Sequence, residues 1–302
     1  MTQLDRVAVS SMLLCGMIWG LGQVAAKVAI AEIPPLLQGG LRSSGSALLL
    51  GLWARSRGIS LFDRDGSLLG GLCAGLLFGS EFACVFVGLQ YTDASRMIVF
   101  VYLAPFVVAL GMPFIADDER LSKAQAAGLF LAFSGVAWAF AEGFTRPAAG
   151  PRQYLGDALG VCAAVLWGAT TLVIRGTRLS RAPAEKILFY QLAVSGVMLL
   201  AAAIAGNEAL PHQLSLVAAG AMLFQIVVVS FASYLLWFWL INHYPATHLA
   251  SFTLVTPLFG LLSGVALLGE PATQRLLIAL AAVATGIVLV NRGSHVVQPT
   301  EV

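Results

Sequence analysis

Charged residues are scarce in this 302-residue sequence. Only 11% of the residues are Asp, Glu, Lys or Arg, whereas a soluble protein carries about 25%. Hydrophobic residues make up 59%, and the mean hydropathy is +0.87. A soluble domain of this length needs a polar surface that this composition does not supply. Intrinsic disorder is excluded too, because it requires low hydrophobicity and high net charge. The composition therefore predicts a polytopic membrane protein.

Other absences narrow the function. The net charge is only +2 and there is no long basic run, so we expect no nucleic-acid partner. The four cysteines lie in apolar runs without metal-ligand spacing, which indicates packing residues rather than a metal site. HExxH, Walker and GxSxG motifs are missing. We therefore expect no cofactor, no metal and no enzymatic activity, and any transport would draw on a solute gradient or a coupled ion.

Long apolar runs fill most of the chain. A helix needs about 20 apolar residues to cross a bilayer, whereas the strands of a membrane barrel need only about 10. Ten runs are long enough for helices, at 7–30, 34–53, 67–90, 92–113, 123–141, 155–176, 184–206, 214–241, 245–267 and 273–291. The sequence thus predicts an all-α polytopic membrane protein with ten transmembrane helices.

Lys and Arg are unevenly divided between the two sides of the predicted membrane. With a cytoplasmic N-terminus, eleven lie on the inner side: Arg6, Arg55, Arg57, Arg64, Arg120, Lys123, Arg175, Arg178, Arg181, Lys186 and Arg292. Five lie on the outer side: Lys27, Arg96, Arg146, Arg152 and Arg275. Positive residues collect in cytoplasmic loops, so both termini are predicted to be cytoplasmic.

The two halves of the sequence share landmarks at nearly constant offsets of 148–152 residues. The pairs are Trp19-Gly20 with Trp167-Gly168, Pro105 with Pro257, Glu119 with Glu270, and Gly135 with Gly286. We interpret this as a duplication with units at 1–142 and 155–292. Each unit holds five predicted helices, an odd number, so the second copy must be inverted in the membrane. Inverted repeats are typical of transporters whose binding site lies where the repeats meet.

The landmarks together resemble a known family. They comprise Trp19-Gly20, Arg42, the stretch 91–95 leading to Pro105, Asp118-Glu119-Arg120, and in the second half Trp167-Gly168, Pro257, Gly269-Glu270-Pro271 and Gly286. Their order, spacing and duplication resemble the EamA-type drug/metabolite transporter superfamily. Within it, the chain is most similar to bacterial inner-membrane exporters of aromatic and other amino acids.

This resemblance implies a central cavity between the two units, alternating access and a location in the bacterial inner membrane. Four-helix relatives need dimers to build an equivalent bundle, so the resemblance also suggests a monomer. One departure concerns the membrane-embedded glutamate in the first helix of the small multidrug-resistance relatives. The first predicted helix here carries Gln23 and Lys27 but no acid, which puts a direct copy of their proton coupling in doubt.

Two charged residues lie deep in predicted spans, where a charge costs about 2.5–3.5 kcal/mol on insertion scales. Arg42 and Glu81 are each roughly 12–13 Å below the outer end of their helices at 1.5 Å per residue. One interpretation is an ion pair that fixes helix packing. The other is a pair that lines a cavity, with Arg42 holding a substrate carboxylate or Glu81 titrating.

Aromatic and polar residues inside the spans complete the candidate site. Buried Trp and Tyr side chains need a partner for their polar group, and a cavity provides one, although ordinary packing remains an alternative. The predicted substrate-binding residues are Trp19, Gln23, Arg42, Glu81, Phe82, Phe86, Tyr102, Trp167, Tyr190, Gln191, Tyr234 and Ser251. Trp237 and Trp239 are interpreted instead as an interfacial anchor.

Pro105 and Pro257 occupy equivalent positions in the two halves. Because proline removes a backbone hydrogen bond and kinks a helix, we predict that they are paired hinges. The predicted function is secondary-active export of aromatic and other apolar or neutral amino acids. The alternatives are export of lipophilic drugs or other metabolites on the same fold, an intramembrane enzyme and a channel.

Overall fold

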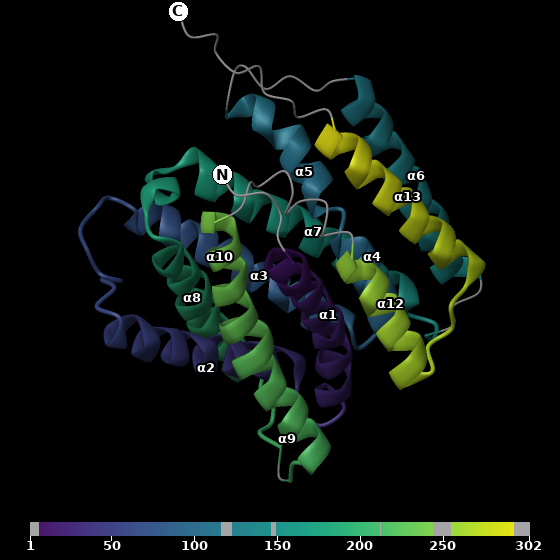
Figure 1. Cartoon of the computed structure of the whole chain (residues 1–302). Helices are drawn as coiled ribbons and strands as arrows, with labels where there is room; N and C mark the ends of the chain where they lie inside the picture. Colours follow the sequence, from purple (N-terminus) through teal and green to yellow (C-terminus); the bar gives the residue numbers. More distant parts are fainter. Residues whose placement is uncertain (1–5, 116–122, 146–148, 212, 244–254, 293–302) are drawn as a thin grey trace, which may run out of the picture.

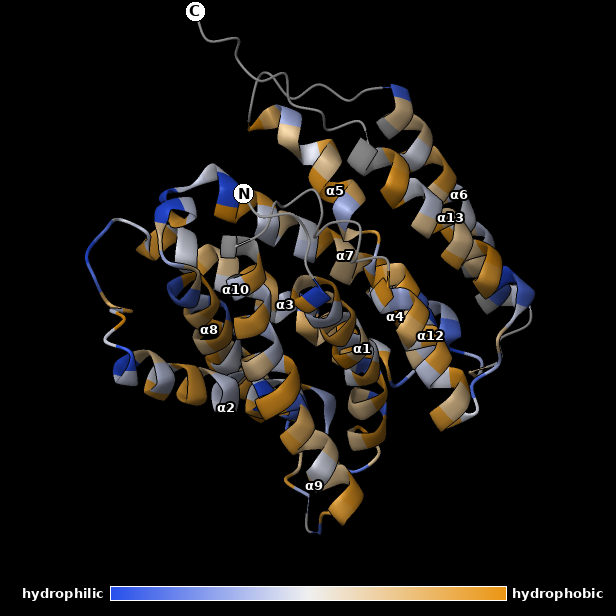
Figure 2. Ribbon diagram, viewed as in Figure 1, coloured by the Kyte–Doolittle hydropathy of each residue, from blue (hydrophilic) through white to orange (hydrophobic). Residues whose placement is uncertain are grey.

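The computed structural model describes residues 6–115, 123–145, 149–211, 213–243 and 255–292 (Figure 1). Within these ranges the regular structure is entirely helical. Six of the described helices are long and apolar enough to cross a membrane, and three shorter apolar helices accompany them in the same ranges. Hydrophobic residues predominate along the helices, whereas many hydrophilic residues lie at helix ends and in loops (Figure 2). The predicted all-α polytopic membrane fold is confirmed at this level.

The helices follow the predicted runs closely. The first half contains α1 (Arg6–Ala29), α2 (Pro35–Ser56), α3 (Leu68–Gly88), α4 (Ala94–Val101), α5 (Ala104–Gly111), the 3-10 turn η1 (Met112–Phe114) and α6 (Lys123–Thr145). The second half contains α7 (Gln153–Gly176), the 3-10 turn η2 (Arg178–Arg181), α8 (Ala184–Ala205), α9 (Leu216–Leu223), the π-helix η3 (Phe224–Ala232), α10 (Ser233–His243), α12 (Val255–Leu268) and α13 (Gln274–Arg292).

The run predicted as one helix at 92–113 is broken between α4 and α5. Pro105 has no backbone N–H to donate to the carbonyl oxygen of Val101, four residues back, and its ring clashes with that carbonyl group. The backbone bonds shift accordingly: the N–H of Leu103 donates to Phe100 at 3.1 Å, and that of Phe106 donates to Leu103 at 3.0 Å, each three residues back. The chain therefore makes a tight turn at Tyr102 and Leu103, just before the proline.

The second predicted hinge is only partly described. Pro257 is buried in the first turn of α12. The residues before Val255, which belong to the ninth predicted run, lie outside the described part of the chain, as do Glu119 and Ser251. The eighth predicted run is continuous, but its middle portion η3 is a π-helix. A π-turn places an extra residue in the helix and so rotates α10 relative to α9.

Small residues let pairs of helices approach closely. A Cβ added to Gly20 of α1 would lie 2.7 Å from the backbone nitrogen of Gly260 in α12. A Cβ on Gly128 of α6 would lie 2.7 Å from the carbonyl oxygen of Gly286 in α13, and these two helices lie side by side in Figure 1. Such stripes of small residues are the usual means of close helix packing in membranes.

Gly20→Ala is expected to lower the free energy of unfolding by about 1–3 kcal/mol, as overpacking does in a tight core. The reason is that the added methyl group meets main-chain atoms of α12, which cannot rotate away. Thermal unfolding in detergent measures the effect. Gly220→Ala in α9 is the matched control, because a Cβ there has no neighbour within 4 Å. Equal melting temperatures for the two variants would contradict the prediction.

Carboxylates of one half cap helix N-termini of the other half. Glu208, before α9, accepts hydrogen bonds from the N–H groups of Leu36 and Leu37 at 3.2 and 2.8 Å. Glu32, after α1, accepts from the N–H and hydroxyl of Ser215, the N-cap residue of α9. These two bonds hold the pKa of Glu32 below its usual value.

A third cap joins α4 to the loop between α12 and α13. The N–H groups of Ala94 and Ser95 donate to the two carboxylate oxygens of Glu270 at 2.8 and 2.9 Å. Each of these carboxylates satisfies N–H groups that no intrahelical carbonyl can reach, and each favours the positive end of a helix dipole. The two halves are therefore joined by polar contacts at their helix ends as well as by apolar packing.

Candidate functional site

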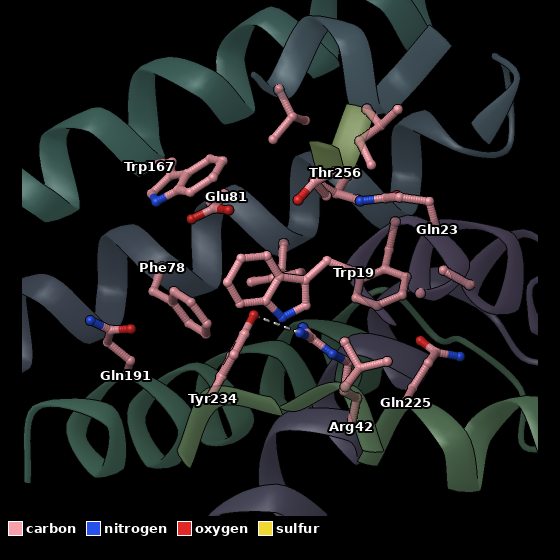
Figure 3. Close-up of a pocket in the computed structure, with 18 of the residues that line it drawn as sticks. Trp19, Gln23, Arg42, Phe78, Glu81, Trp167, Gln191, Gln225, Tyr234 and Thr256 are labelled. Carbon is pink, nitrogen blue, oxygen red and sulfur yellow. Dashed lines mark hydrogen bonds between the residues drawn. The ribbon is translucent and has the colours of Figure 1, made fainter. Parts of the chain in front are cut away.

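A cavity of about 260 Å³ lies among helices of both halves (Figure 3). Most of the predicted binding residues line it: Trp19, Gln23, Arg42, Glu81, Phe82, Phe86, Tyr102, Trp167, Gln191 and Tyr234. Sequence reasoning missed several others: Phe78, Ile98, Leu188, Gln225, Val229, Trp237 and Thr256. The walls are largely aromatic and aliphatic, with a few polar groups among them.

Helical spacing explains why α1 and α3 contribute more wall residues than any other helix. Residues at i, i+3, i+4 and i+7 share one face of a helix. On α1 this face carries Trp19, Gly22, Gln23 and Ala26, and on α3 it carries Phe78, Glu81, Phe82 and Val85. The missed residue Phe78 follows from this spacing once Glu81 and Phe82 are placed.

Arg42 does not form the ion pair with Glu81 that the sequence suggested. Its Nη2 donates to the hydroxyl of Tyr234 at 3.2 Å, and its guanidinium carbon lies 4.0 Å from the centre of the Phe82 ring. The side chain is 3% exposed, and Nη1 has no hydrogen-bond partner. Within the described chain, the ion pairs belong to Arg96 and Lys186. Stacking on Phe82 and bonding to Tyr234 hold Arg42 without neutralising its charge.

Glu81 is the acidic group of the cavity. It is 5% exposed, and its Oε2 is buried without a hydrogen-bond partner. Figure 3 shows its carboxylate beside Trp167, away from the guanidinium of Arg42. The cavity thus contains two unpaired polar atoms, the Nη1 donor of the Arg42 guanidinium and the Oε2 oxygen of the Glu81 carboxylate.

One predicted binding residue, Tyr190, is not brought to the cavity. The ring of Tyr190 packs on α3, where a Cβ on Gly71 would lie 2.5 Å from it. Tyr190 shares one face of α8 with Val194 and Met198, which also pack on glycines of α3. Its depth in the membrane was predicted, but its direction around the helix was not. Ser251 lies outside the described residues.

Trp237 lies in the cavity and not at an interface, contrary to its interpretation as an anchor. Its ring packs edge-on against Trp19, with 5.3 Å between ring centres. Trp19 also contacts Tyr234, and its indole N–H donates to the hydroxyl of Ser233 at 2.8 Å. Tyr234 and Trp237 are three residues apart, and this spacing was the signal that could have placed them on one face.

A buried ionic cluster joins α4, α6 and α7. Arg96 is 2% exposed and bonds to Asp157 at 2.6 Å and to Glu142 at 2.9 Å. It also donates to the carbonyl oxygen of Ala139 at 2.8 Å. Thr92 donates to Asp157, and Thr273 donates to Glu142. Sequence reasoning missed this cluster because it treated Arg96 as a loop charge.

Lys27 and Lys186 are also held by the protein. The ammonium of Lys27 donates to the carbonyl oxygens of Leu89 and Thr92, between α3 and α4. Lys186 is 1% exposed and pairs with Asp65 at 2.9 Å. Hydrogen bonds from Ser67 and Lys186 hold the pKa of Asp65 well below its usual value. These lysines, like Arg96, cannot be counted as free loop charges.

Comparison with known proteins identifies the family. The chain matches the EamA-like transporter family twice, over residues 6–141 and 154–292. It therefore belongs to this family of membrane transporters, and the predicted resemblance is confirmed.

Individual relatives agree with this assignment. The uncharacterized transporter YvbV of Bacillus subtilis (strain 168) is 28% identical, with 91% of this chain and 88% of that protein covered. A probable amino-acid metabolite efflux pump of Salmonella typhimurium (strain LT2) is 24% identical, with 94% and 92% covered. A crystal structure at 18% identity shares the fold, with a TM-score of 0.64 over 94% of this chain and 97% of the other.

Proposed function

We propose that this transporter exports amino acids, aromatic and other apolar or neutral ones, by alternating access across a bacterial inner membrane. The main observation in support of this proposal is the unpaired Nη1 of Arg42 in a cavity with aromatic walls. A guanidinium is the side chain best matched to a carboxylate, and aromatic walls suit an apolar side chain. The amino-acid metabolite efflux named for the Salmonella relative is consistent with this substrate class.

The size of the cavity favours a small metabolite over a drug. Its volume is about 260 Å³, whereas typical ligand pockets measure roughly 300–1,000 Å³. Export of lipophilic drugs is the alternative. It would leave the desolvated guanidinium of Arg42 without a function, because a lipophilic cation offers no anionic group to it.

The helix contacts support two inverted five-helix repeats, with units at 1–142 and 155–292 and ten spans in all. Such a repeat requires that contacts occur in equivalent pairs. In the proposed repeat, α7 is the counterpart of α1, and α12 is the counterpart of α4 and α5. The contact of α1 with α12 then corresponds to the contact of α7 with α4 and α5. In the same way, the contact of α3 with α7 corresponds to the contact of α1 with α9, η3 and α10. Gly20 faces Phe259, and its counterpart Gly168 faces Val107. Val107 and Phe259 are 152 positions apart, which is the repeat offset, so the two glycines face equivalent residues.

Both termini are cytoplasmic in this proposal, and the protein works as a monomer. The charge bias remains after Lys27, Arg96 and Lys186 are set aside as buried or held groups, because ten positive residues then stay on the inner side and three on the outer. The cavity is lined from both halves of a single chain, so no second copy is needed to build it.

The turn at Tyr102 and Leu103 supports the hinge hypothesis for Pro105. Pro105→Ala restores the missing N–H and is expected to straighten α4 and α5 into one helix. The rate of exchange should then fall several-fold, by about 3- to 10-fold at a barrier change near 1 kcal/mol, with little change in half-saturating concentration. Initial rates at varied substrate concentration measure both. A change confined to the half-saturating concentration would contradict the hinge.

Counterflow in proteoliposomes tests the proposed function. Vesicles preloaded with unlabelled phenylalanine should take up labelled phenylalanine transiently, and labelled threonine should behave similarly. Excess unlabelled amino acid outside should block this uptake. If neither amino acid exchanges while a lipophilic cation does, the alternative substrate class is correct.

A further inference from the structure

We propose that Glu81 is a shared site for a proton and for the ammonium group of the substrate, so that each exported amino acid is exchanged for one proton. This inference rests on the proposed function and adds the energy source and a second substrate contact to it. Neither the family match nor the relatives assign a coupling ion.

The geometry separates two charged subsites in one cavity. Arg42 donates to Tyr234 through Nη2 and stacks on Phe82, and its unpaired Nη1 is available to a substrate carboxylate. Glu81 stands on α3, and its Oε2 has no partner. An oxygen of this kind, buried away from water, needs either a proton or a cationic group. An amino acid carries one group for each subsite, an α-carboxylate for Arg42 and an α-ammonium for Glu81.

The surroundings of Glu81 leave it free to exchange its partner. The charged and titratable groups that face it are Arg42 on α2, Tyr234 on α10 and Cys84 on its own helix. From α7 and α8 the cavity receives Trp167 and Gln191, which are neutral. Arg42 is the only fixed cation among the cavity-lining residues of the described chain, and its direct bonds go elsewhere. No protein group therefore blocks Glu81 permanently.

The cycle balances as follows. In the inward-facing state, the substrate ammonium displaces the proton from Glu81, and this proton leaves to the cytoplasm. In the outward-facing state, the amino acid leaves and a proton from outside replaces it. The protein returns with Glu81 protonated. One proton enters for each amino acid that leaves, so a zwitterionic substrate moves one positive charge inward per cycle.

The test uses the full-length protein in proteoliposomes, with the membrane potential clamped by valinomycin and equal potassium on both sides. With a lumen one pH unit more acidic, labelled phenylalanine should accumulate about tenfold inside, since one pH unit equals a tenfold concentration ratio. A pH-sensitive dye in the lumen should report alkalinisation on phenylalanine addition. Glu81→Gln loses the ionic contact with the substrate ammonium and should therefore exchange phenylalanine more slowly in counterflow. Its accumulation ratio should stay near one, and its dye signal should vanish.

Two further variants complete the design. Glu81→Asp keeps an exchangeable carboxylate and should keep gradient-driven accumulation. Glu185→Gln, in the first turn of α8 and outside the cavity, should behave as the wild type. If Glu81→Gln does not fold, the proposal is tested by the wild-type dye signal and by gradient-driven accumulation in Glu81→Asp.

The outcomes distinguish the two proposals. Wild-type exchange without accumulation or proton movement would overturn this inference and leave the proposed function standing. Proton-driven accumulation by Glu81→Gln would overturn it as well. Failure of the wild-type protein to exchange any amino acid would overturn the proposed function, and this inference with it.

Discussion

Replacing Arg96 with methionine is expected to destabilise the protein by about 3–5 kcal/mol, the largest effect we foresee for a single substitution. The variant leaves the carboxylates of Glu142 and Asp157 buried without their cation. Asp157 is fully buried, so water cannot replace the guanidinium. Thermal unfolding in detergent, followed by size-exclusion chromatography, measures the loss.

Two controls separate this effect from the loss of a positive charge alone. Arg55→Met removes a charge from the exposed end of α2 and should leave the melting temperature nearly unchanged. The triple variant Arg96→Met, Glu142→Gln, Asp157→Asn removes all three charges and should recover much of the stability, because no unpaired ion remains. A single Arg96→Met variant as stable as Arg55→Met would show that the cluster contributes little.

Replacing Arg42 with methionine is expected to lower the transport efficiency for phenylalanine roughly 10- to 100-fold. A hydrogen bond to a charged group contributes about 1.5–3 kcal/mol, and methionine keeps the contact with Phe82 while removing the donor. Counterflow rates at low substrate concentration measure this ratio. The same variant should transport phenethylamine, which lacks the carboxylate, with little loss.

Tyr234→Phe is the matched control for Arg42→Met. It removes the hydroxyl that accepts from Nη2 and keeps both the ring against Trp19 and the guanidinium. We expect only a several-fold loss, near the 0.5–1.5 kcal/mol of an ordinary hydrogen bond. An equal loss for phenylalanine and phenethylamine in Arg42→Met would mean that Arg42 acts on cavity structure and not on the carboxylate.

The helices were predictable because a membrane span is a local property of the sequence. A run of about 20 apolar residues has few alternatives to a helix in a bilayer, and the described helices follow these runs. Most cavity residues were predictable for a similar reason. Trp19, Arg42 and Glu81 are amphipathic or charged groups at mid-span depth, where only a cavity or a partner can satisfy them.

Direction around a helix and long-range partners were not predictable from these signals. Tyr190 has a suitable depth but turns toward Gly71 of α3. The spacing could have placed Trp237 beside Tyr234, but the π-helix before both residues leaves no clear mark in an apolar sequence, so the direction of α10 relative to α9 was not predictable. Arg96 seemed to belong to a loop, because its partners Glu142 and Asp157 are 46 and 61 residues away. Such pairs exist only once the helices have assembled.

The crossed helix caps have a consequence for how the protein is made. The first turn of α2 emerges from the ribosome long before Glu208, and that of α4 long before Glu270. During synthesis these N–H groups have only water or lipid headgroups as partners, so the newly inserted first half stays incomplete until the second half arrives. Conversely, Glu32 is already in place to receive Ser215 as α9 inserts. The helix caps of the first half are therefore completed only late in translation, after Glu208 and Glu270 have been synthesised.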